Sequence, residues 1–243
     1  MTISPDFSVA STAVTAALAA LLLLGEPVIG RRAYGSLARR RDTEPRALVR
    51  YFTFVLALWW AYAAVAVAAL LLSPGIDAAD LGITAPERPG YTVALILVFL
   101  AVAVASGRNF RGLAEQGKNV PGLASIEAML PRTTEERRLA IAVAVTDGIC
   151  AELVYRGLLI AFGVGVLGLN LYAAAAVSAV VYAVAGLYQG RTGVGAFALY
   201  GVVLAGLYLA TGSLLLSVVA HTALSVRDLT LPAPDRLRAA PAA

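Results

Sequence analysis

Few side chains of this sequence could do acid–base chemistry within apolar segments, and five stand out. Asp147, Glu152 and Arg156 lie in the segment TDGICAELVYRGLL, and the only histidine, His221, lies in a second segment with Ser225 one helical turn further on. The four-residue spacing predicts that Glu152 and Arg156 share a helix face and form an ion pair. Carboxylates and an imidazole are also groups that can act as general bases toward water.

A purely structural role for these residues is the alternative. Glu152 and Arg156 would then only neutralise each other inside a helical bundle, and His221 would be satisfied by a neighbouring carbonyl or hydroxyl group. Asp147 precedes Glu152 by a rotation of about 500°, so the two carboxylates diverge by roughly 140°. They cannot both lie centrally on one face, although both could border a cavity. Cys150 is interpreted as a small packing residue.

The elements that must position these residues are hydrophobic helices. Of the 243 residues, 60% are hydrophobic and 14% are charged, whereas soluble domains carry about 25% charged residues. Crossing a bilayer takes roughly 20 apolar residues in a helix. We therefore predict an all-α, polytopic helical membrane protein with about seven transmembrane helices, the third of them short. The expected spans are 8–29, 48–72, 91–106, 139–164, 169–188, 194–210 and 213–226.

The spans suggest three regions. Residues 1–130 would hold three membrane helices and a basic cytoplasmic loop, 131–229 a core of four spans, and 230–243 a disordered tail. The string PRTTEERR predicts a helix start in which Thr133 or Thr134 is the cap. The glutamates that follow would lie in the first turn, where they favour the helix dipole.

Charges outside the spans predict the orientation, since loops rich in Lys and Arg stay cytoplasmic. The loop between the second and third spans holds Asp77, Asp80 and Glu87 against Arg88 alone, which fits the outer side. We expect a multi-pass cell-membrane protein with its N-terminus outside and its C-terminus cytoplasmic. The net charge of +4 then reflects orientation, and no nucleic-acid partner is expected. The loops expected inside carry Arg31, Arg32, Arg39, Arg40, Arg41, Arg46, Arg50, Arg108, Arg111, Lys118, Arg132, Arg137 and Arg138.

The remaining charged residues, and the residues of metal-binding types, indicate no further catalytic or metal site. Glu26 and the Arg227/Asp228 pair lie near expected membrane boundaries, where snorkelling accounts for them. One cysteine and one histidine exclude an internal disulfide and any zinc scheme that needs two imidazoles. No metal or other cofactor is therefore expected.

Three short motifs occur in order in the second half of the chain. The first is Ala-Glu-x-x-x-Arg-Gly from Ala151 to Gly157, and the second is Tyr182 with Gly186 four residues on. The third is His221 followed by Ser225. Together with their surroundings, from about Pro131 to Arg227, they resemble the CAAX prenyl protease and bacteriocin-processing family (CPBP, or abortive infection family) of intramembrane glutamate proteases.

The resemblance implies a role for each motif position. In the family, a glutamate at the position of Ala151 and a histidine at the position of Gly186 orient and deprotonate the attacking water. The histidine matching His221, with an asparagine or aspartate at the position of Ser225, stabilises the oxyanion. Alanine and glycine offer no such groups. The supporting Glu152 and the oxyanion-side residues remain, with Arg156 beside them.

Asp147 is a possible replacement for the lost base. It lies one helical turn before Ala151 on the same stripe, which shifts its carboxylate by about 6 Å. A shift of that size is large where 1 Å can cost a hundredfold in rate. The position of the Asp147 side chain relative to His221 is therefore the decisive observation.

Three functions follow from these residues. The first is a CPBP-type membrane protein with weakened or lost peptidase activity and a cavity that binds lipid, a prenylated or membrane-associated peptide, or a partner protein. The second is an active intramembrane protease for CAAX-type or other membrane-associated C-terminal peptides that uses Glu152, His221 and Asp147. The third is a non-enzymatic scaffold or transporter. The sequence lacks the broken mid-membrane helices of many transporters, which counts against a transporter.

Overall fold

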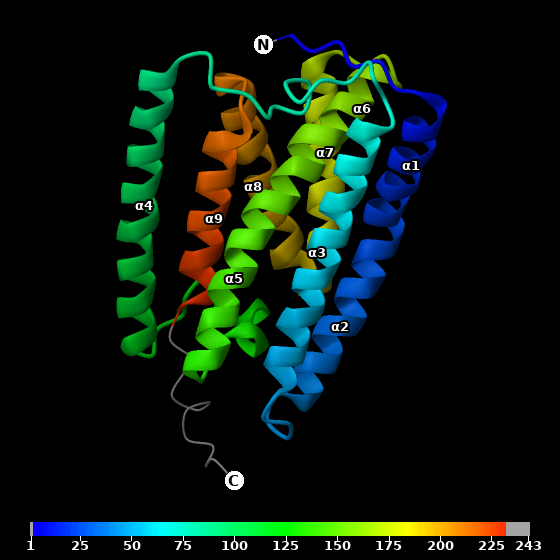
Figure 1. The fold of residues 1–243 in the computed structure, drawn as a ribbon. Helices are drawn as coiled ribbons and strands as arrows, with labels where there is room; N and C mark the ends of the chain where they lie inside the picture. Colours follow the sequence, from blue (N-terminus) through cyan, green and yellow to red (C-terminus); the bar gives the residue numbers. More distant parts are fainter. Residues whose placement is uncertain (1, 232–243) are drawn as a thin grey trace.

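The computed structural model describes residues 2–231 and consists of helices joined by short connections (Figure 1). Within these residues the only β contact is an isolated bridge between Asp6 and Gly75. The predicted all-α class is confirmed, and the predicted disordered tail falls almost entirely outside the described residues. The α-helices are α1 (Val9–Ala20), α2 (Glu26–Arg40), α3 (Ala47–Leu71), α4 (Pro89–Glu115), α5 (Thr134–Ala151), α6 (Ile160–Gly165), α7 (Leu171–Ala185), α8 (Gly190–Thr211) and α9 (Leu214–Leu229).

Two π-helical segments join shorter helices into long ones. Leu21–Gly25 connects α1 to α2, and Glu152–Leu159 connects α5 to α6. The resulting helices, Val9–Arg40 and Thr134–Gly165, each contain 32 residues. A π-helical turn carries an extra residue and rotates the side chains that follow it, and such turns are frequent at functional sites. The second π-helical segment begins at Glu152, one of the predicted site residues.

Five helical stretches of the described chain are long and apolar enough to cross a membrane. The structure corrects the expected bounds of the first and third spans, because the first helix continues to Arg40 and α4 has 27 residues rather than being short. The stretch Leu171–Thr211 contains both α7 and α8, which fold back on each other at Gly190, whose φ is +75°. With 16 residues, α9 falls below the length of a full span. The exact number of seven therefore stays a prediction.

Charged loops separate to opposite ends of the bundle. In Figure 1 the N-terminus and the α3–α4 connection lie at the upper end, whereas the α2–α3 and α4–α5 connections lie at the lower end. The upper connection contains the acidic residues Asp77, Asp80 and Glu87, and the arginines of the other two connections lie below. Which end faces the cytoplasm stays a prediction.

The central helices enclose the core, and α4 stands at its edge. Apolar side chains from α1, α3, α7 and the Glu152–Leu159 segment form the largest buried cluster. In Figure 1, α4 runs beside α9 at one side of the bundle, away from α3. Among the elements with substantial contacts, α4 packs only against α9. The predicted site residues Glu152 and His221 are buried inside the bundle, at 0% and 2% exposure.

A buried ion pair fastens the N-terminal helices to α5. Glu136 accepts hydrogen bonds from both terminal guanidinium nitrogens of Arg41, at 2.8 and 2.9 Å, and the Arg41 and Glu136 side chains are 5% and 3% exposed. Thr133 caps α5 in a reciprocal capping box with Glu136, which confirms the predicted helix start. One carboxylate thus joins the end of α2 to the start of α5.

Glu136→Gln should lower the free energy of unfolding by about 3–5 kcal/mol, because it leaves the buried Arg41 charge without its partner. Thermal unfolding of the purified protein in detergent measures this loss. Glu135→Gln is the matched control, since Glu135 binds Arg46 in an exposed pair at the same junction and should cost about 0–1 kcal/mol. Equal losses in both variants would contradict the assignment of the clamp to the buried pair.

Candidate functional site

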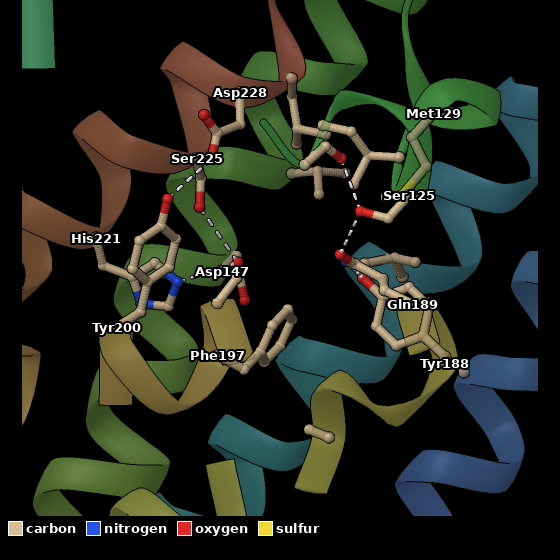
Figure 2. Close-up of a pocket in the computed structure, with 18 of the residues that line it drawn as sticks. Ser125, Met129, Asp147, Tyr188, Gln189, Phe197, Tyr200, His221, Ser225 and Asp228 are labelled. Atoms are coloured by element: carbon tan, nitrogen blue, oxygen red, sulfur yellow. Dashed lines mark hydrogen bonds and ion pairs between the residues drawn. The ribbon is translucent and has the colours of Figure 1, made fainter. Parts of the chain in front are cut away.

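Asp147, Glu152 and His221 meet in the interior between α5 and α9. Nδ1 of His221 lies 2.7 Å from Oε1 of Glu152. Nε2 of the same ring lies 3.3 Å from Oδ2 of Asp147. Figure 2 shows Asp147 and His221 facing each other across this contact. The imidazole therefore bridges the two carboxylates, one at each ring nitrogen.

The bridge resolves the divergence predicted from the helix geometry. The two nitrogens of an imidazole point in different directions, so one ring can contact carboxylates that do not share a helix face. Glu152 also begins the π-helical segment, where the rotation per residue changes. Asp147 borders the cavity described below, and its side chain is 27% exposed. Hence its carboxylate lies beside His221 within the site rather than at the boundary of the bundle.

Arg156 forms a buried ion pair with Glu152. Its Nη1 donates to Oε1 of Glu152 at 2.9 Å, and its Nη2 donates to the carbonyl oxygen of Gly201 in α8 at 3.1 Å. The predicted ion pair is present, and both side chains are almost fully buried, at 0% and 1% exposure. Because an ionised carboxylate can only accept hydrogen bonds, we assign the proton of the Glu152–His221 contact to Nδ1.

Tyr182 covers the opposite side of this network. Its ring lies 4.6 Å from the guanidinium carbon of Arg156, within the range of a cation–π contact. Its hydroxyl group lies 3.3 Å from Nε2 of His221. Ser225 donates to Oδ2 of Asp147 over 3.5 Å, a long and therefore weak hydrogen bond. The structure thus brings together every polar residue that the sequence singled out.

A cavity of about 510 Å³ adjoins the network. Asp147, His221 and Ser225 line one side of it, and aromatic side chains, among them Trp59 and Phe197, line much of the rest. Cavities of this size and largely apolar lining are typical of small-molecule sites. Among the described residues, no group of three or more His, Cys, Asp or Glu side chains is arranged to hold a metal ion.

Ala151 is buried in apolar packing. It is fully buried in the cluster that includes Leu18, Tyr62 and Ala66 of α1 and α3. A glutamate there would place a carboxylate among hydrocarbon side chains. Cys150 is likewise fully buried and unpaired, in agreement with the packing role expected for it.

Phe197 closes the space beside Gly186. A Cβ atom added to Gly186 would lie 2.8 Å from the ring of Phe197 and 2.9 Å from the carbonyl oxygen of Gly193. The Phe197 ring in turn stacks on Tyr182, with centroids 5.1 Å apart and an interplanar angle of 28°. The position that carries a histidine in the resembled family is therefore filled by side chain and backbone of α8.

Glu26 is a site residue that the sequence interpretation missed. Snorkelling at a membrane boundary is wrong for it, since the helix continues from Val9 to Arg40 and Glu26 lies near its middle. Glu26 lines the cavity and accepts a hydrogen bond from the hydroxyl group of Tyr62 at 2.6 Å. The predicted span ended at residue 29, whereas the π-helical segment Leu21–Gly25 lets the helix continue to Arg40.

Arg227 and Asp228 also line the cavity, so snorkelling does not describe them either. Nε of Arg227 donates to Asp228 at 2.7 Å, and Nη2 donates to the hydroxyl group of Tyr200 at 2.8 Å. The guanidinium group also contacts Ser106 and the ring of Phe110 in α4. This pair therefore connects α4 and α8 to α9 at the edge of the cavity.

The fold and site define a helical protein with membrane-length apolar helices and a buried carboxylate–imidazole network beside a cavity. Comparison with protein families is more specific. Residues 135–226, less than half of the chain, match the model of the type II CAAX prenyl endopeptidase Rce1-like family. This match confirms the resemblance seen in the motifs. No curated protein and no solved structure gives a significant match.

Gly186→Ala should lower the free energy of unfolding by about 1–3 kcal/mol, because the added methyl group overlaps Phe197 and a backbone oxygen. Gly206→Ala is the control in α8, where nothing lies within 4 Å of the added Cβ and alanine is the better helix former. Unfolding in detergent compares the two variants. A loss at Gly206 as large as that at Gly186 would contradict the steric explanation.

Proposed function

We propose that this protein is a membrane-embedded relative of the CAAX endopeptidases with weakened or lost peptidase activity. Its cavity would bind the membrane-embedded part of a lipid, a prenylated or membrane-associated peptide, or a partner protein. The observation that carries the proposal is the closed space beside Gly186, where Phe197 and the Gly193 carbonyl leave no room for a water-activating histidine. Ala151 supports it, since that position faces apolar packing.

The charges of the site also favour a binding role. Glu152 pairs with Arg156 and with His221 through Oε1, and its side chain is fully buried and is not among the residues that line the cavity, which keeps it from water there. The cavity remains open beside them and is lined mainly by apolar and aromatic side chains. An apolar chain with a few polar groups fits such a lining better than a soluble substrate does.

An assay with prenylated and unprenylated C-terminal peptides tests the loss of activity. The full-length protein in lipid nanodiscs should release product no faster than the Glu152→Ala variant, because the groups that activate water are missing. Cleavage that disappears in Glu152→Ala would contradict the proposal.

Binding should be visible through Trp59, which lines the cavity, whereas Trp60 is 56% exposed on the outside of α3. A farnesylated peptide should change the tryptophan fluorescence saturably in the wild type and in Trp60→Phe, and the change should be lost in Trp59→Phe. The absence of a saturable change, or a change that depends on Trp60 alone, would refute binding in the cavity.

An active protease is the second candidate, and the position of Asp147 favours it. The Asp147 carboxylate borders the cavity and lies 3.3 Å from Nε2 of His221, so a carboxylate is available beside the imidazole. A water molecule at this wall of the cavity would have a general base within reach. In this candidate Asp147 replaces the missing glutamate, and His221 keeps its place on the oxyanion side.

If the protease is active, Asp147→Asn should reduce turnover by roughly 100-fold or more, since general acid–base catalysis contributes about 100- to 10,000-fold. Asp228→Asn is the matched control, because it removes a cavity carboxylate that binds Arg227 rather than His221. Any peptidase activity of the wild type is measured against both variants. An unchanged rate in folded Asp147→Asn would eliminate Asp147 as the base.

A further inference from the structure

Helix α2 carries three arginines that the site does not use. Arg31, Arg32 and Arg39 are exposed and form no ion pair with any described residue. The arginines that follow them are paired differently: Arg40 and Arg50 bind Glu44, and the remaining pairs are Arg41–Glu136 and Arg46–Glu135. Helix α2 thus carries three exposed arginines without an acidic partner among the described residues.

These arginines line a groove with apolar walls. The groove has a volume of about 580 Å³, and its other lining residues are Pro27, Val28 and Leu187. Val28 and Leu187 are 46% and 51% exposed, so both are available for apolar contacts. The groove therefore combines guanidinium groups with exposed hydrocarbon side chains.

Two elements distant in sequence build this groove. Leu187 belongs to the 3₁₀ turn Gly186–Gln189 between α7 and α8, whereas all the other lining residues come from α2. The two elements approach closely because Gly30 has no side chain, and a Cβ there would lie 3.3 Å from the Tyr188 ring. Gly30 and Tyr188 line the central cavity, so the groove lies on the opposite side of the same contact.

We propose that this groove binds an anionic phospholipid, with the phosphate on Arg31, Arg32 and Arg39 and an acyl chain against Val28 and Leu187. Arginine presents a planar set of donors that binds phosphate oxygens in pairs, which suits it for this contact. The groove lies at the basic end of the bundle, the end expected to face the cytoplasm, where anionic lipids attract basic residues. The site is separate from the central cavity and does not depend on the proposed function.

The occupant is assigned from the groove's charge and lining. Three cationic groups without acidic partners call for an anion, and the apolar walls call for a hydrocarbon chain attached to it. A soluble phosphate would bind the arginines but would leave the apolar walls of the groove exposed. The lipid uses both, and it would connect α2 to the α7–α8 turn from outside the bundle.

Native mass spectrometry of the full-length protein with phosphatidylglycerol or phosphatidylcholine tests the proposal. The wild type should bind phosphatidylglycerol tightly and phosphatidylcholine at least tenfold more weakly. Combined replacement of Arg31, Arg32 and Arg39 by Gln should weaken phosphatidylglycerol binding by roughly 100-fold, since each arginine near an anionic surface is worth about a factor of five.

The control variant replaces Arg111, Arg137 and Arg138 by Gln. It removes the same charge from exposed, unpaired positions of α4 and α5 at the same end of the bundle, and it should change the affinity less than threefold. Equal losses in the two variants, or equal binding of the two lipids by the wild type, would overturn the proposal. Binding of glycerol 3-phosphate as tight as that of the lipid would overturn the assignment of the acyl chain.

Discussion

The buried Glu152 carboxylate constrains the whole core. An ionised group with no exposure is costly inside an apolar bundle unless charges and hydrogen-bond donors surround it. Arg156 and His221 supply them from the following turn and from α9. Arg156 in turn uses the Gly201 carbonyl of α8. One carboxylate therefore fixes how three elements meet, and the side chains around the cavity are arranged on that framework.

Around this framework the residues that balance the buried charge are present, whereas the groups that activate water in the resembled family are missing. Glu152 pairs with both Arg156 and His221, whereas Ala151 is buried in apolar packing and Phe197 leaves no space for a larger side chain at Gly186. Phe197 matters most here, because it stacks on Tyr182 and covers Gly186 at once. Asp147 alone offers a carboxylate to both His221 and the cavity. The buried pairs of Glu152 favour the binding role, whereas the peptidase role depends on the Asp147 carboxylate at the cavity.

Helix continuity also decides which charges belong to the site. The π-helical segment Leu21–Gly25 lets the first helix run on to Arg40, and this places Glu26 at the cavity and carries the three unpaired arginines of α2 past it. One side of α2 therefore lines the central cavity, while another carries the basic groove. A helix ending at residue 29 would have left the three arginines in a loop and Glu26 at a helix end.

The sequence by itself determined the apolar helices, the alternation of charged loops, the Glu152–Arg156 pair, the capping of α5 and the family resemblance from about Pro131 to Arg227. All of these depend on composition or on spacing within one helix, where geometry is local. Only the tertiary structure decided that His221 bridges Asp147 and Glu152, that Glu26 and Arg227 line the cavity, and that Phe197 covers Gly186. These contacts join residues tens of positions apart, so they depend on how the helices pack together, which no spacing within a single helix specifies.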